Sequence, residues 1–152
     1  MSSEQYRAPA EGHFRSSVGM HLRHNLDHFE AFFGGLESGE LDYESRSRQT
    51  QIEDIPGLAE EAIQGYLEKL NQLRDADEEL LKIREESEAG SKQRRWLDSS
   101  LGRELQFLLG HTVHHNAIIA MIVDRHGVVL PECFGVAPST LRHEAKSEVV
   151  EG

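Results

Sequence analysis

The sequence is short of several features that define common classes of protein. It holds a single cysteine among 152 residues, so an internal disulfide is excluded. No apolar run approaches the roughly 20 residues that a membrane-spanning helix needs. The first dozen residues are polar and lack the apolar segment of a signal peptide. We therefore expect no membrane partner and a cytoplasmic location.

The chain is also poor in positive charge. It carries 16 lysines and arginines against 27 aspartates and glutamates, which gives a formal net charge of −11 at pH 7. Because binding of nucleic acid depends on basic side chains that neutralise phosphates, we expect no nucleic-acid partner. The length fits one domain. We expect a flexible lead-in over residues 1–13, a helical domain over 14–143 and a polar tail over 144–152.

Histidine, by contrast, is abundant, with nine residues. Two of them, His111 and His115, lie in a segment from 99 to 127 that has the periodicity of one long helix. Leu108 and Ile118 are spaced from them by three residues, so all four side chains share one face of that helix. The pattern therefore places two imidazoles in an otherwise apolar stripe.

This histidine pair has two interpretations. Histidines at i and i+4 can place two imidazole nitrogens on one metal ion, as in the HExxH motif of zinc enzymes, and a third ligand must then come from elsewhere. Alternatively, the two rings are core residues whose nitrogens are satisfied by backbone carbonyls or by each other. The spacing alone does not decide between a metal site and a structural pair.

A candidate third ligand lies near the start of the chain. The apolar periodicity of residues 14–36 predicts a helix, and His21, His24 and His28 form a second stripe beside its apolar arc. Three histidines on the flank of a helix are equally compatible with a solvated polar surface. Periodicity does not say which of the three points inward.

The middle of the chain gives weaker signals. Residues 55–73 have helical spacing, whereas 78–98 fit either a β-hairpin with a turn at Gly90-Ser91 or a ragged helical extension. The polar connector between the first two helices contains Asp42 and Tyr43. We expect a solvated connector there, with a position near a pocket mouth as the alternative.

The two histidine-bearing segments, SVGMHLRHNLDHF and LGHTVHHNAIIAMI, resemble the DinB/YfiT-like superfamily of metal-dependent proteins. The likeness extends to SSLGRELQFL before the late histidines and to FGVAPSTL after them. It implies an all-α, up-down four-helix bundle, whose first helix would be shortened in this chain. By the same likeness, His24, His111 and His115 are the residues that match the metal ligands of the family.

The resemblance also implies chemistry. Three imidazoles leave a coordination position open, which is typical of a catalytic metal site, and nickel, zinc, iron and manganese all suit such ligands. We expect a small-molecule substrate and either a thiol-dependent S-transferase, with a low-molecular-weight thiol as cofactor, or a hydrolase. Asp27, His28 and Glu104 are the candidates for orienting the ligands or transferring protons.

Two alternatives belong to a different class of function. The cation could only stabilise the helices, with a fourth protein ligand such as His28 closing the site. The bundle could also be free of metal and act as a dimeric interaction module, because a shortened first helix leaves an apolar face exposed. In either case we expect the chain to form a homodimer.

Overall fold

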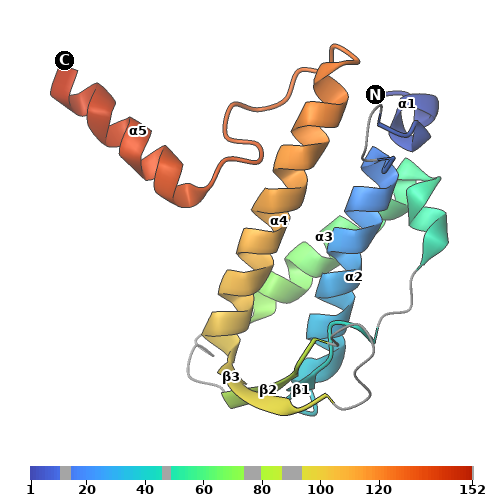
Figure 1. The fold of residues 1–152 in the computed structure, drawn as a ribbon, viewed down its shortest axis with the longest axis vertical. Coiled ribbons are helices and arrows are strands. Elements are labelled where there is room, and N and C mark those ends of the chain that lie inside the picture. The colour runs from blue at the N-terminus through green and yellow to red at the C-terminus, as the bar shows by residue number, and fades with distance from the viewer. Residues whose placement is uncertain (11–14, 46–48, 74–79, 87–93, 152) are drawn as a thin grey trace.

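A computed structural model describes residues 1–10, 15–45, 49–73, 80–86 and 94–151 (Figure 1). The chain is mostly helical and carries a small three-stranded sheet. The elements, in chain order, are α1 (Ser3–Arg7), α2 (Val18–Leu36), β1 (Glu40–Leu41), the 3₁₀ helix η1 (Thr50–Glu53), α3 (Pro56–Gln72), β2 (Leu80–Arg84), β3 (Trp96–Ser100), α4 (Leu101–Asp124) and α5 (Pro138–Glu151).

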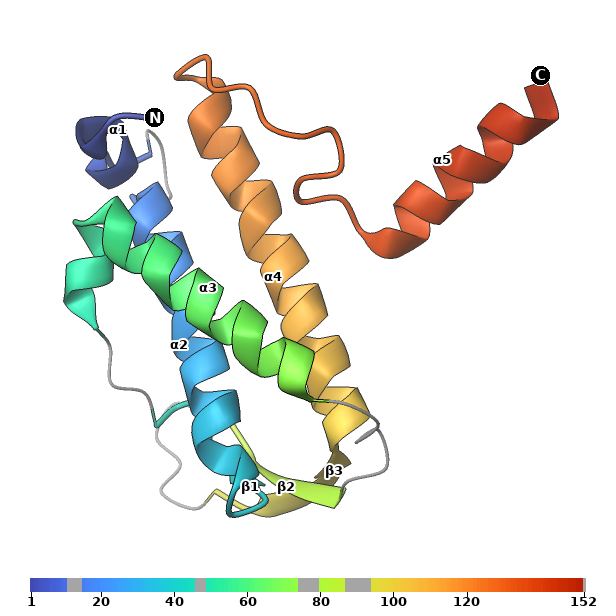
Figure 2. The same cartoon turned by 180° about the vertical axis from the view of Figure 1, so that it is seen from behind.

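The long helices α2 and α4 lie side by side and run in opposite directions, while α3 crosses them on one side (Figures 1 and 2). Helices α2 and α4 both begin at a serine cap, which the sequence predicts for α4. The Ser17 hydroxyl accepts a hydrogen bond from the Met20 amide, and the Ser100 hydroxyl accepts one from the Arg103 amide. These caps satisfy amide groups that the first turn of a helix leaves unpaired.

Two apolar clusters fill the space between the elements. The first joins α1, α2, η1, α3 and the end of α4, and the Tyr6 hydroxyl in it donates a 2.7 Å hydrogen bond to the Ile52 carbonyl. The second lies at the other end, where Phe32, Leu41 and Leu101 are almost fully buried under the sheet. The histidine-bearing stretch of α2 and α4 runs between the two clusters.

The sheet has the order β1-β2-β3. Strands β2 and β3 are antiparallel, with Leu80 opposite Ser100, which confirms the predicted β-hairpin; its predicted turn at Gly90-Ser91 lies outside the described residues. Strand β1 pairs in parallel with β2, with Leu41 opposite Ile83. The sequence did not predict this third strand.

The helical class is confirmed, but the four-helix bundle is not. Helix α5 projects away from the other helices (Figures 1 and 2), and α2, α3 and α4 form the body of the protein. Residues 1–13 include the short helix α1, which buries Tyr6, and α5 extends to Glu151. Among the described residues, no helix has both the length and the apolar character needed to cross a membrane.

The first turn of α2 provides a test of this packing. A Cβ added at Gly19 would overlap the Glu53 carbonyl oxygen and lie 2.6 Å from the Tyr6 ring. Gly19→Ala should therefore lower the free energy of unfolding by about 1–3 kcal/mol, the usual cost of overpacking, as measured by urea unfolding.

The matched control is Gly65→Ala in α3, where an added Cβ meets no atom within 4 Å. This substitution should raise the free energy of unfolding by about 0.5–1 kcal/mol, because alanine favours a helix more than glycine does. Equal effects at the two glycines would contradict the described contact between α1, η1 and α2.

Candidate metal centre

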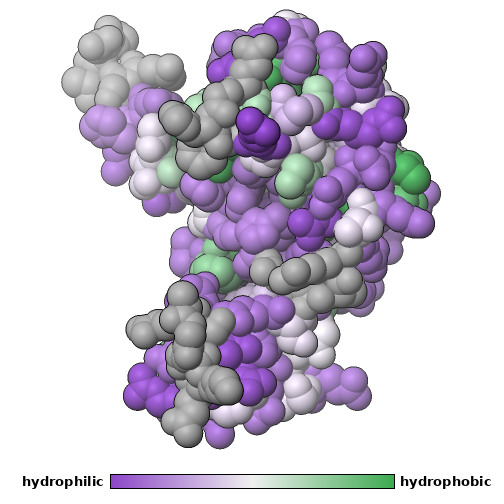
Figure 3. All heavy atoms as spheres, turned by 45° about the vertical axis from the view of Figure 1, so that its right-hand side comes forward, coloured by the Kyte–Doolittle hydropathy of each residue, from purple (hydrophilic) through white to green (hydrophobic). Residues whose placement is uncertain are grey.

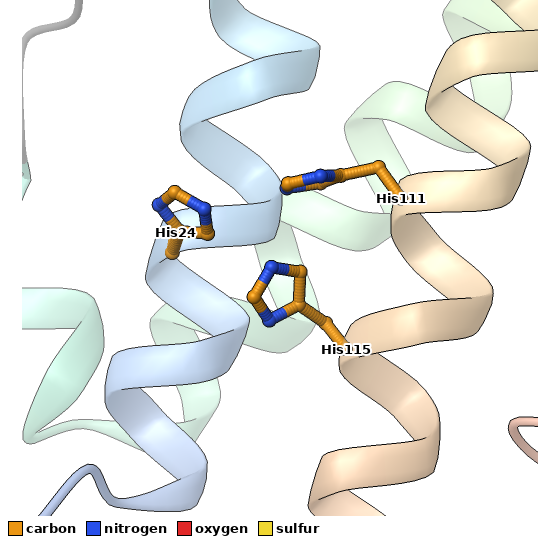
Figure 4. Close-up of side chains that lie close together, drawn as sticks. All are labelled: His24, His111 and His115. Atoms are coloured by element: carbon orange, nitrogen blue, oxygen red, sulfur yellow. The ribbon is translucent and has the colours of Figure 1, made fainter. Parts of the chain in front are cut away.

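Helices α2 and α4 bring together His24, His111 and His115, the three residues that the sequence resemblance selects (Figure 4). One ligand atom from each ring lies within 4.8 Å of the others. His111 and His115 stand one turn apart on α4, as their spacing requires, and His24 faces them from α2. His115 is buried, and the other two rings are partly buried.

A polar contact between the helices fixes their register at this level. The Thr112 hydroxyl donates a 3.3 Å hydrogen bond to Oδ1 of Asn25, which is 7% exposed. Because these residues adjoin His111 and His24 in the sequence, the bond keeps the histidines of α2 and α4 at the same height. Sliding one helix along the other would leave the buried Asn25 amide unpaired, at a cost of about 1–3 kcal/mol.

His111 and His115 hold neutral rings. Burial, followed by the nearby rings of His28, His115 and His24, lowers the pKa of His111 to about 3. Burial and then His21 lower the pKa of His115 to about 4. At neutral pH both rings therefore keep a lone pair on one nitrogen, and this is the form of imidazole that binds a metal ion.

The residues present fit a divalent ion. The buried Nε2 of His111 has no hydrogen-bond partner among the described residues, although leaving such an atom bare is costly. Histidine nitrogens bind zinc at about 2.0–2.1 Å, so two ligand atoms on one ion lie at most about 4.2 Å apart. The ligand nitrogens of the three histidines lie within 4.8 Å of one another, which is slightly wider than this separation. Small ring rotations would bring the three nitrogens onto one ion.

Three further histidines surround this group. The His28 ring lies 3.9 Å from the His111 ring, centroid to centroid, and its Nδ1 donates a 2.9 Å hydrogen bond to the His24 carbonyl. His21 contacts His115 through a 3.0 Å hydrogen bond between the two Nδ1 atoms. His114 is exposed, and its ring lies 5.1 Å from that of His115, centroid to centroid. Of the extra histidines, His28 and His21 are the neighbours that also form hydrogen bonds with the residues of the predicted site.

The other two candidates for orienting groups lie in different settings. Asp27 is buried and forms a 2.7 Å ion pair with Arg23 on its own helix. Glu104 is fully buried, and it accepts hydrogen bonds from Tyr43 (2.9 Å), Ser99 (2.5 Å) and Arg103 (2.8 Å). These contacts show Glu104 as an anchor for the neighbouring segments, whereas His28 is the candidate that touches the predicted ligands.

A cavity of about 650 Å³ opens beside the histidines. His24, His28 and His111 line one part of it, Tyr43 and Phe107 line another, and Arg84 and Arg103 lie among the remaining lining residues. Polar and apolar groups therefore both face the space next to the three imidazoles.

Tyr43 is the site residue that the sequence analysis placed wrongly. It is 6% exposed rather than part of a solvated connector, its ring stacks on His28 at 5.5 Å, and burial followed by the Glu104 carboxylate raises the pKa of its phenol. An aromatic residue in an otherwise polar connector was the signal that could have identified it. Its neighbour Asp42 is held by a two-pronged ion pair with Arg94, which fixes the segment over the cavity.

The fold and the site together define a class: a helical protein that gathers three histidines from two antiparallel helices beside a cavity. The comparison with known families agrees with that description. The model of the DinB family matches residues 1–144, so the chain belongs to the DinB family.

A curated relative is similar over part of its length. The chain is 33% identical to FK506-binding protein 5 of Rhizopus delemar over 109 residues. The match covers 70% of this chain and 28% of that protein, so the chain spans little more than a quarter of its relative. No solved structure matches the chain.

The depressed pKa values predict how the metal-free protein responds to acid. In the unfolded chain His111 and His115 titrate near pH 6.5, whereas in the fold their pKa values lie near 3 and 4. Between these values the unfolded state binds more protons, so stability is lost as the pH falls below about 6.5 and is independent of these two rings above it.

Urea unfolding with a chelator present, at about pH 7.5, 6.5 and 5.5, measures this effect. The free energy of unfolding should fall only slightly over the upper step and more steeply over the lower one. His111→Gln removes one of the two depressed rings, so its decline should be shallower than that of the unaltered chain. An equally steep decline in the variant would contradict the assignment.

Proposed function

We propose that this DinB family protein is a metal-dependent enzyme in which His24, His111 and His115 hold one divalent ion. The observation that carries the proposal is the position of the three rings, which lie together while two of them, His24 and His111, line a cavity large enough for a small-molecule substrate. A purely structural ion is usually enclosed by four protein ligands, whereas a catalytic ion keeps a position for water or substrate.

The ion would supply a Lewis acid, which lowers the pKa of a bound water or holds a thiol as its thiolate. The first chemistry belongs to a hydrolase and the second to a thiol-dependent S-transferase with a low-molecular-weight thiol as cofactor. Nickel, zinc, iron and manganese are all compatible with three imidazoles. Family membership supports a site of this kind without choosing between the reactions.

The protein's own residues divide the remaining tasks. His28 donates its Nδ1 hydrogen to the His24 carbonyl, so its neutral ring carries the lone pair on Nε2 and can take a proton from a substrate in the cavity that it lines. Tyr43 and Phe107 would pack against the apolar part of a substrate, and Arg84 and Arg103 would face its polar part. Glu104 keeps Tyr43 in place.

Metal analysis tests the site directly. Protein purified without nickel chromatography should contain about one divalent ion per chain, and His24→Ala and His111→Ala should each lose it, because a site with two imidazoles binds far more weakly. Added metal should raise the melting temperature of the unaltered chain only. The control is His114→Ala on the exposed side of α4, which should keep its ion.

The outcome separates the classes of function. The enzyme would be supported if the unaltered chain binds metal and turns over either a thiol with an electrophile or an ester. His111→Ala should then lose that turnover. Metal without turnover, and with His28→Ala also losing the ion, would indicate a closed structural site. Protein that binds no divalent ion after reconstitution would overturn the proposal.

The homodimer expected from the sequence stays a prediction. Leu109 and Met121 are exposed on α4 and could be covered by a second copy, whereas the face drawn in Figure 3 is mostly hydrophilic with small, separate hydrophobic areas. Sedimentation should give twice the mass of one chain, and dilution should lower the melting temperature. A mass of one chain at every concentration would contradict the dimer.

A further inference from the structure

His21 uses both of its ring nitrogens on neighbouring side chains. Its Nδ1 lies 3.0 Å from Nδ1 of His115, and its Nε2 lies 2.8 Å from the Ser16 hydroxyl. The three side chains thus form a continuous chain of hydrogen bonds that starts just before α2 and ends on α4. His21 does not belong to the group of nitrogens that surrounds the candidate metal position.

The hydrogen atoms along this chain can be assigned from elementary chemistry. A neutral imidazole carries one N–H, and a metal ion needs the nitrogen without it. Because Nδ1 of His115 contacts His21, Nε2 is the nitrogen available to an ion. In Figure 4, one nitrogen of the His115 ring points toward the space between the three rings and the other points away from it.

Only one arrangement satisfies both contacts and also leaves Nε2 of His115 free for an ion. His115 carries its hydrogen on Nδ1 and donates it to the bare Nδ1 of His21. His21 must therefore carry its own hydrogen on Nε2, where it donates to the Ser16 hydroxyl oxygen. In the reverse arrangement His21 would donate to Nδ1 of His115, and the hydrogen of His115 would sit on Nε2 and block the ion.

We propose that His21, held by Ser16, is a positioning residue that keeps His115 in the tautomer whose Nε2 is bare and turned toward the candidate metal position. This inference rests on the proposed function, because the need for a bare Nε2 on His115 is what selects the order of the hydrogens. Partners of this kind, which bind the second nitrogen of a metal-ligating histidine, fix its orientation and typically contribute about 10- to 100-fold to metal affinity.

Zinc binding, measured by competition with a chromophoric chelator, tests the first half. His21→Leu should weaken binding about 10- to 100-fold. His21→Asn places an amide oxygen near the position of Nδ1 and can accept the same hydrogen bond, so it should bind within about threefold of the unaltered chain, because the accepting atom is kept. His114→Leu, at a histidine outside the hydrogen-bond chain, is the matched control and should also stay within about threefold.

The variants distinguish the roles that His21 could have. Equal losses in His21→Leu and His21→Asn would make His21 a ligand itself and overturn a positioning role. Unchanged binding in both would show that His115 needs no partner. Melting temperatures of the metal-free variants, which should agree with that of the unaltered chain, exclude general damage to the fold.

The second half, the order of the hydrogens, is measured on the metal-free chain, so that its failure can be distinguished from a failure to bind metal. Nitrogen-15 NMR of the imidazole rings near neutral pH reports which nitrogen carries the hydrogen. We expect His115 with its hydrogen on Nδ1 and His21 with its hydrogen on Nε2. The opposite order of the hydrogens would overturn the proposal. Loss of the preference of His115 for its Nδ1 hydrogen in His21→Leu would confirm that His21 causes that preference.

Discussion

The structure depends on the packing of imidazoles between two helices. His111 contacts the rings of His24, His28 and His115, with centroids 3.9–5.1 Å apart. A positive charge on His111 would be poorly hydrated and repelled by charge on its neighbours, so burial and proximity lower the pKa of this ring and keep it unprotonated. The neutrality that makes the packing tolerable also leaves the lone pairs that a cation needs, and in this way one constraint serves both stability and binding.

The supporting contacts are arranged around that group. Asn25 and Thr112 hold the helices in register, and His21 turns one ring toward the centre. At the far end of the cavity the buried Glu104 joins three separate parts of the chain, because it is bound by Tyr43, Ser99 and Arg103. The three donors offset the cost of removing the Glu104 carboxylate from water, and losing one of them would be destabilising. The helices therefore set the positions of the imidazoles, and the sheet end sets the position of the opposite wall.

The sequence predicted the parts that local geometry determines. The spacing of His111 and His115 fixed their common face as soon as 99–127 was assigned to a helix, and Ser100 marks its beginning as expected. The choice of His24 over its neighbours needed the family resemblance, since periodicity did not say which of the three histidines points inward. Strand β1 has two residues and pairs with a strand about forty positions later, so no local pattern announces it. The pairing of β1 with β2 brings Tyr43 to the cavity. The sequence therefore predicted neither this strand nor the buried position of Tyr43.

The helices carry the imidazoles and the sheet end carries the opposite wall of the cavity. This separation has a consequence for how such a protein diverges in evolution. The imidazoles lie on two long, rigid helices, whereas Tyr43 and Arg84 reach the same cavity from a short connector and a strand. Connecting segments accept substitutions and changes of length more readily than packed helices do. New shapes of the wall can therefore arise by mutation while the arrangement of the imidazoles is inherited intact. A scaffold of this type can acquire different substrates without rebuilding its centre.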